Sequence, residues 1–307
     1  MDTLQAVKGK GVVIRIIFIT LVMIVTQAHS EDLVPPHWKR FGFEQRGSNP
    51  KLMMNVPEVA LSPSEWDRLA AGEPVTRLID SPGEYKIGYL RFFAPIDPVT
   101  AWMVVTDYEH YDLVDPSFDA SGSITEKRRT FWPNAFENNV CLSNGEYRVS
   151  QLIVVPFVKP RKLCLVGTFN TEFFPWEAHL DLAGVARCCE DRSDPVFQRY
   201  FDKAVVVQRN KESWFISPLP ERFQNGTTDA LRADCTYVAD VNPGGELGRF
   251  DFIAKAAATY SLPQLAKHVI THGRQWERFL LDRYGEDELQ SYRQWLKRYQ
   301  QAREGKR

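Results

Sequence analysis

The first regular pattern of apolar and polar residues along the chain is that of a short helix after residue 60. The stretch Ser62-Pro63-Ser64-Glu65 has the form of a capping box, with Pro at the first helical position. Trp66 and Leu69 fall on one face, and Gly72 ends the pattern. We therefore expect a helix over these residues. Residues 31–60, which show no sustained period, are expected to form an extended arm.

The middle of the chain follows a strand pattern that one helix interrupts. A first strand is predicted from Tyr85 to Phe93, and Asp97-Pro98 precedes a predicted helix from Val99 to Thr106. Between Ser123 and Gln208 the sequence is mostly β-like. Segments rich in β-branched and aromatic residues cover Tyr147–Val155, Lys162–Phe169, Glu177–Leu182, Tyr200–Gln208, Glu212–Ser217 and Leu231–Val241.

The end of the chain is predicted to be helical. Apolar residues recur there at three- and four-residue steps, which places them on one stripe of a long amphipathic helix: Leu262, Leu265, Ala266, Val269, Ile270, Gly273, Trp276 and Leu280. A further helix that contains Leu289, Tyr292 and Trp295 is expected to be more peripheral. The order is helix, strand, helix, a long antiparallel run of strands and a long helix, so the predicted class is α+β.

The first 30 residues have the three parts of a signal peptide. A basic segment with Lys8 and Arg15 precedes an apolar run from Ile16 to Val25, and small residues follow at Ala28 and Ser30. The run is about half of the ~20 residues that a membrane-spanning helix needs. We expect cleavage of this segment and a secreted or periplasmic location, with an uncleaved anchor as the alternative.

Charge and cysteine content narrow the classes of function. The chain carries 38 basic and 39 acidic side chains, whereas a nucleic-acid-binding protein normally has a basic excess, so we expect no nucleic-acid partner. After export the 5 cysteines would meet an oxidising compartment, and their odd number leaves at least one free or paired with another chain. Cys141 with Cys164 is the first expected pair, because both lie in strand-like segments that could be neighbours.

Three segments of the chain match, in order and spacing, the motifs of one known fold. Residues 98–111 read Pro-Val-Thr-Ala-Trp-Met-Val-Val-Thr-Asp-Tyr-Glu-His-Tyr, residues 236–245 combine a strand with a Gly-rich exit turn, and residues 256–265 lead into the C-terminal helix. Together they resemble START-type helix-grip domains and the related polyketide-cyclase-like proteins of the SRPBCC superfamily. The resemblance covers roughly residues 60 to 276. Residues 171–195 look longer than in that family, and the helix after Arg278 is additional.

The resemblance implies a curved antiparallel sheet wrapped around a long C-terminal helix, with a cavity for a lipid, sterol or other hydrophobic molecule. Each buried CH2 group of such a ligand is worth about 0.8 kcal/mol. Candidate lining residues, which could instead fill a solid core, are Val149, Leu165, Val206, Phe215, Ile253, Ala257, Tyr260, Leu265 and Val269. Loop aromatics that could gate the cavity or touch a membrane transiently, or else fold back on the core, are Trp132, Phe173, Phe174 and Trp176.

Motifs for metal or covalent chemistry are weak. His268 and His272 are one helical turn apart, but Val269 occupies the position where a metalloprotease helix needs Glu. Residues 177–181, Glu-Ala-His-Leu-Asp, alternate, yet same-face side chains ~6.6 Å apart cannot share one ion, which favours a solvated strand face. No G-x-S-x-G nucleophile elbow occurs. We expect no metal and no cofactor, and we assign no catalytic residue.

The leading hypothesis is therefore an exported carrier of a hydrophobic ligand. The sequence does not indicate a protein partner. The alternatives are a partner-binding protein with a filled core, or a cyclase-, aromatase- or hydratase-type enzyme. Acid–base candidates for such an enzyme are Asp107, Tyr108, Tyr147, Arg148, His179 and Tyr237. The expected organisation is a signal peptide at 1–30, an arm at 31–60, the helix-grip domain at 61–276, and an extra C-terminal helix and tail at 277–307.

Overall fold

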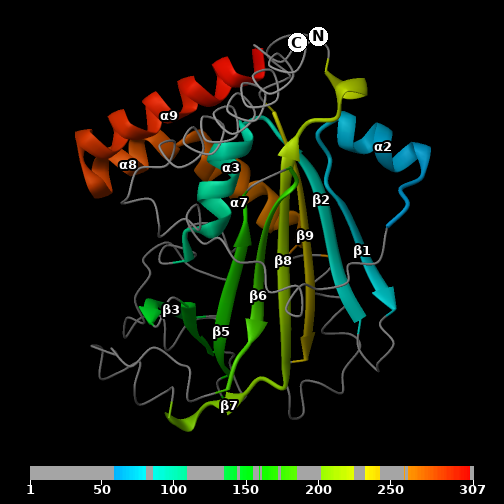
Figure 1. Ribbon diagram of the computed structural model, residues 1–307. Coiled ribbons are helices and arrows are strands. Elements are labelled where there is room, and N and C mark those ends of the chain that lie inside the picture. Colours follow the sequence, from blue (N-terminus) through cyan, green and yellow to red (C-terminus); the bar gives the residue numbers. More distant parts are fainter. Residues whose placement is uncertain are drawn as a thin grey trace, which may run out of the picture.

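The centre of the protein is one twisted, almost entirely antiparallel sheet (Figure 1). A computed structural model describes residues 59–80, 86–108, 135–143, 146–154, 159, 161–171, 174–184, 202–224, 232–242, 259 and 262–304. Within these ranges the sheet has nine strands in the order β1-β2-β9-β8-β6-β5-β4-β3, and β7 pairs with β5 in parallel. The strands are β1 (Val75–Asp80), β2 (Lys86–Ala94), β3 (Ala135–Ser143), β4 (Glu146–Val154), β5 (Arg161–Asn170), β6 (Trp176–Leu182), β7 (Val205–Val206), β8 (Arg209–Pro218) and β9 (Ala233–Asn242).

Helices lie mainly at one end of the sheet. Figure 1 shows α3 and α7 beside the upper part of the sheet, α9 across the top with α8 beneath it, and α2 beside β2. The helix bounds are α2 (Pro63–Ala70), α3 (Pro98–Thr106), α7 (Leu262–Arg274), α8 (Trp276–Tyr284) and α9 (Glu286–Glu304), with a 3-10 turn at Glu221–Phe223. This arrangement confirms the predicted α+β helix-grip class.

The two early helices begin where the sequence predicts. The Glu65 backbone N–H donates to Ser62 Oγ at 3.4 Å, and the Ser62 N–H donates back to Glu65 Oε2 at 2.8 Å, which completes the capping box of α2. Asp97 caps α3, because its Oδ1 accepts from Val99 N–H at 3.0 Å and Thr100 N–H at 2.9 Å. Every residue of α3 is buried, so this helix forms part of the core.

The C-terminal segment differs from the predicted single long helix followed by a peripheral one. The apolar stripe is interrupted after Arg274, and α8 begins at Trp276. Gly285, with φ of 89°, then turns the chain into α9. α9 is not peripheral, because its apolar stripe belongs to the main core cluster through Leu289, Tyr292 and Trp295.

Two strand predictions also need correction. The segment Tyr200–Gln208 contributes only the two-residue strand β7, although it is rich in β-branched and aromatic residues. The edge strand β1 had not been predicted. It has a single buried residue, Val75, so it lacks the buried-exposed alternation by which a strand is recognised in sequence.

Strict alternation gives the sheet an inner and an outer face. The inner face is the one whose side chains join the core cluster with α3, α7 and α9: Leu90, Phe92, Leu163, Leu165, Trp176, Ala178, Leu180, Trp214, Ile216, Cys235 and Tyr237. Their outward neighbours, such as Tyr89 and Val238, form separate clusters on the outer face. Because side chains alternate with a period of two, each strand residue can be assigned to one face.

Candidate ligand-binding face

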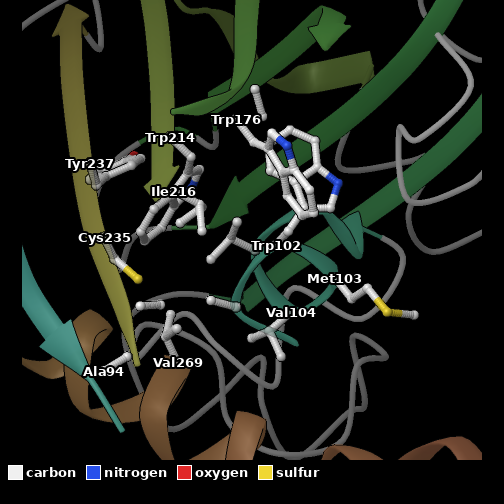
Figure 2. Close-up of a cluster of buried hydrophobic side chains, with 14 of the residues drawn as sticks. Ala94, Trp102, Met103, Val104, Trp176, Trp214, Ile216, Cys235, Tyr237 and Val269 are labelled. Carbon is white, nitrogen blue, oxygen red and sulfur yellow. The ribbon is translucent and has the colours of Figure 1, made fainter. Parts of the chain in front are cut away.

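The helix-covered end of the inner face is filled by aromatic rings. Trp102 of α3 meets Phe169 of β5 and Trp176 of β6 edge-on, with ring centroids 6.2 and 5.9 Å apart. Figure 2 shows Trp102 and Trp176 side by side, with Trp214 and Ile216 on the neighbouring strand and Val269 approaching from α7. Such offset and edge-to-face contacts are the favoured geometries of aromatic pairs, so this end is a packed core.

The middle of the inner face changes character, because three positions of one register row carry little or no side chain. One register row runs through Leu78, Gly88, Ala239, Glu212, Leu180, Gly167, Tyr147 and Leu142, from β1 to β3. Gly88, Ala239 and Gly167 carry little or no side chain. A Cβ atom on Gly88 would lie 3.6 Å from Leu262 Cδ1, so α7 occupies the β2 end of this row. The row is therefore shallow on β9 and β5, on either side of Glu212 and Leu180.

Polar side chains gather on β8 at and beside this row. Asn210, Glu212 and Trp214 share the inner face at successive alternate positions. Asn210 and Trp214 are each 1% exposed, and Asn210 Nδ2 and Trp214 Nε1 have no hydrogen-bond partner. Burial raises the pKa of the Tyr108 hydroxyl at the end of α3, and the Glu212 carboxylate raises it further. Hydrogen-bonding groups thus face an otherwise apolar interior.

The predicted lining residues fall into three groups. Val149, Leu165, Leu265 and Val269 are buried members of the core cluster on the inner side. Phe215 lies on the outer face beside Val238, and Val206 is 41% exposed, so neither can line the inner face. Ile253, Ala257 and Tyr260 lie outside the described residues. A lining role for the first group stays a prediction.

Two of the four predicted gate residues, Phe174 and Trp176, pack against α9. Phe174 stacks on Trp176 with ring centroids 4.7 Å apart, and Trp176 lies 6.2 Å from Trp295 and 6.3 Å from Tyr299. Phe174 is 37% exposed and Trp176 only 7%. Trp176 therefore folds back on the core, which was the alternative to a gate or membrane contact for these loop aromatics. Trp132 and Phe173 lie outside the described residues.

The strand order does not support the expected disulfide between Cys141 and Cys164. Their strands, β3 and β5, pair with opposite edges of β4 and are not neighbours. Two strand spacings of about 4.8 Å exceed the ~7 Å Cα separation that a disulfide tolerates. Cys164 is nevertheless disulfide-bonded, and Cys235 is a buried free thiol on the inner face.

The acid–base candidates do not form one site. Tyr108 and Tyr237 are on the inner side of the sheet, whereas Arg148 and His179 point to the outer face by alternation with Val149 and Leu180. Asp107 is the C-terminal cap residue of α3 and is buried. The side chain of Tyr147 lies outside the described residues, although the register assigns its position to the inner face.

His179 is buried, contrary to the solvated strand face predicted for it. It is 3% exposed, and its Nδ1 lies 2.8 Å from Ser213 Oγ and its Nε2 3.2 Å from Glu177 Oε2. This trio resembles a serine relay with the two ring nitrogens exchanged. Ser213 is itself 1% exposed, and the Phe215 ring packs edge-on against the imidazole. The trio therefore serves as a polar link between β6 and β8.

Of the two helical histidines, His272 is part of the α7–α8 packing. His272 contacts Trp276 and Phe279 edge-on, with ring centroids 5.4 and 4.9 Å apart. Across the described ranges, no group of three or more His, Cys, Asp or Glu side chains is placed to hold a metal ion. In the same residues, none of the helices combines the length and apolarity required to cross a membrane.

Comparison with known proteins gives similarity at the level of structure only. No family model matches the chain, and no curated protein matches it. Human STARD10 matches with 12% identity and a TM-score of 0.45, over 82% of this chain and 93% of that one. A STAR-related lipid transfer protein fragment from Xanthomonas axonopodis matches with 14% identity and a TM-score of 0.45, over 66% and 94%.

A third similar structure is the di-domain ARO/CYC BexL, with 11% identity and a TM-score of 0.35 over 65% of this chain and 48% of that one. These likenesses agree with the resemblance of the sequence to START and polyketide-cyclase-like domains as regards the fold. Because their TM-scores are all below 0.5, the functional argument rests on the residues of this protein.

Proposed function

We propose that this protein binds a hydrophobic or amphipathic small molecule between the inner face of the sheet and its helices, and carries it outside the cytoplasm. The observation that carries the proposal is the change along the inner face. Packed aromatic rings at one end give way to the small residues Ala239 and Gly167, next to buried polar groups without partners. A solid core would be expected to fill such a row with larger side chains.

The energetics of such a site favour an apolar ligand. Burying apolar surface is worth about 25 cal/mol per Å², so the apolar part of a bound molecule needs no covalent chemistry to be held. The neighbouring inward positions Leu165 and Val149 continue the apolar surface toward β4. Ligand pockets are typically apolar with a few placed polar groups, which is the composition of this part of the sheet.

Two features support an exported location. The N-terminal segment has the basic, apolar and small-residue parts of a signal peptide. Cys164 is disulfide-bonded, and disulfides persist mainly in oxidising compartments. Cell fractionation of the tagged full chain, with an N-terminal sequence of the accumulated form, tests the location. Recovery in the cytoplasm with residues 1–30 still present would contradict it.

Filling the row tests the binding proposal. Ala239→Leu adds a branched side chain on the inner face of β9, beside Glu212. We expect the purified variant to lose most of its capacity to extract an alkyl probe from phosphatidylcholine vesicles, because the added volume displaces the ligand. The matched control is Thr236→Leu on the outer face of the same strand, which should leave extraction unchanged. Equal extraction by Ala239→Leu and wild type, with both folded, would contradict a ligand in this row.

A further inference from the structure

We propose that the inner side of β8 recognises the polar end of a neutral amphipathic lipid that carries an ester or amide carbonyl together with a hydroxyl group. The inference rests on the proposed function and names its ligand class. The residues that make the distinction are Asn210, Glu212 and Trp214, at alternate positions of one strand.

Two donors select the carbonyl. Asn210 Nδ2 and Trp214 Nε1 can only donate hydrogen bonds, and both are buried without a partner. Leaving such a donor unsatisfied costs about 1–3 kcal/mol, whereas a carbonyl oxygen of a bound ligand would remove that cost. A pure hydrocarbon brings no acceptor and would leave the cost in place. The donors therefore favour a ligand with oxygen acceptors over one without them.

The carboxylate between the donors selects against anions. Glu212 lies on the inner face between Asn210 and Trp214, and its charge acts on the buried Tyr108 hydroxyl. A second negative charge beside the Glu212 carboxylate would be repelled by it, whereas a neutral group would not. A ligand hydroxyl can instead donate to a carboxylate oxygen. Glu212 thus favours a neutral hydroxylated head group over the carboxylate of a fatty acid.

The length of the polar strip also distinguishes among neutral ligands. Same-face residues are about 6.6 Å apart, so Asn210 and Trp214 are separated by about 13 Å along β8. A head group with several oxygen atoms, such as a glycerol ester, can reach two of the three groups at once. The apolar chain would then lie over Leu180 and Gly167, the neighbours of Glu212 in its register row.

The test compares three probes of equal chain length: 1-monooleoylglycerol, oleate and 1-octadecene. Each is presented in phosphatidylcholine vesicles at about pH 9, where a carboxylic acid is ionised. The bound fraction is titrated against the purified protein. We expect the wild type to prefer monooleoylglycerol to both other probes. Asn210→Leu should weaken monooleoylglycerol binding about five- to tenfold and leave octadecene binding unchanged, as the loss of one hydrogen bond predicts.

The melting temperature gives a second readout. If Asn210 had a purely structural role, its replacement would lower the melting temperature. Asn210→Leu replaces an unpartnered buried donor by an apolar side chain of similar size, so the melting temperature of the ligand-free protein should stay or rise. The matched control is Asn242→Leu on the outer face, where Nδ2 donates to Gln208 Oε1 at 3.1 Å. That variant should melt earlier and keep its affinity for monooleoylglycerol. Trp214→Phe keeps an aromatic ring, removes the N–H donor and should reproduce the selective loss.

The outcomes separate this inference from the proposed function. A wild type that binds none of the three probes contradicts the carrier proposal itself. Equal binding of all three, tighter binding of oleate, or unchanged monooleoylglycerol affinity in both Asn210→Leu and Trp214→Phe overturns the head-group site. In each of those cases the carrier proposal would still be supported if the wild type extracts the alkyl probe and Ala239→Leu does not. A ligand-bound crystal structure in which internal water satisfies both donors would also overturn it.

Discussion

The inward-facing side chains at the two ends of strand β8 lie on the same face of the sheet, but their surroundings differ. At the helix-covered end, Ile216 is completely buried among rings and aliphatic side chains from α3, α7 and the neighbouring strands (Figure 2). At the other end, Asn210 is nearly as buried, yet its amide donor has no partner. Burial alone therefore does not distinguish the two ends; the chemistry of the buried side chain does, because Ile216 is apolar and Asn210 carries a hydrogen-bond donor.

The difference implies a division of roles along one strand. Well-packed apolar contacts stabilise the fold, whereas an unpaired buried donor costs stability and is retained where something else uses it. Substitutions at the helix-covered end should therefore lower stability. Substitutions at the Asn210 end should change ligand affinity with little loss of stability.

The largest expected effect is that of removing α9. A chain that ends at Gly285 loses Leu289, Tyr292 and Trp295 from the core cluster. Burying each such side chain is worth about 1.5–3 kcal/mol, so the loss of about 5–9 kcal/mol is comparable with the whole stability of a typical domain. We expect the shortened protein to lack a cooperative thermal transition by circular dichroism.

The control for this truncation alters only the exposed side of α9. Lys297→Ala with Arg298→Ala changes two exposed residues and should shift the melting temperature by a degree or two at most. A chain ending at Gly285 that melts cooperatively close to the full-length protein would show that α9 is peripheral, as predicted from the sequence.

Helix starts and most strands could be predicted from local signals, and the burial of α9 could not. The caps at Ser62 and Asp97 act within three residues, so the sequence contains all the partners. The stripe of α9 is visible in sequence, but its packing partners, such as Trp176, come from a strand more than a hundred residues away. The break after Arg274 is hidden because the apolar stripe resumes at Trp276.

The sequence predicts the site only where it predicts which face of the sheet each strand residue occupies. Trp214-Phe215-Ile216 is apolar at three consecutive positions, so the pattern gives no reason to prefer one face, and Phe215 was assigned to the wrong one. The expected pair of Cys141 with Cys164 assumed neighbouring strands, but strand order is not encoded in spacing, and β4 lies between β3 and β5. Asn210 was not singled out. A polar residue at an inward position of an alternating strand is the signal that could have identified it.

A single substitution in α3 should give the next largest effect. Trp102 is completely buried and contacts Phe169 and Trp176 edge-on. Trp102→Ala should lower the free energy of unfolding by about 3–5 kcal/mol, measured by urea denaturation, because it leaves a large cavity. Val206→Ala, at an exposed position, should change it by no more than about 0.5 kcal/mol.

The same variant also probes the division of roles. Under conditions where Trp102→Ala remains folded, its affinity for the alkyl probe should be close to that of the wild type. A variant that keeps its stability and loses binding would place Trp102 in the wall of the ligand site, and the helix-covered end would no longer count as purely structural.

The smallest effect is expected at the partly exposed cap of α2, where charge rather than packing contributes. Hydrogen bonds from Arg77 and from the Ser62 backbone lower the pKa of Glu65 from 4.5 to about 2. Arg77 Nε donates to Glu65 Oε1 at 2.9 Å. Because the folded-state pKa lies below the unfolded value, this stabilisation is present above pH 4.5 and is lost as the pH falls toward 2.

Glu65→Gln should therefore lower the free energy of unfolding by about 1 kcal/mol or less at neutral pH, and the difference from wild type should shrink steadily below pH 4.5. Urea denaturation of both proteins across this pH range measures it. Glu73→Gln is the control, because its ion pair with Arg68 joins two side chains that are more than half exposed and should contribute little at any pH. A Glu65→Gln deficit that persists at acid pH would mean that the contribution of Glu65 to α2 does not depend on the charge of its carboxylate.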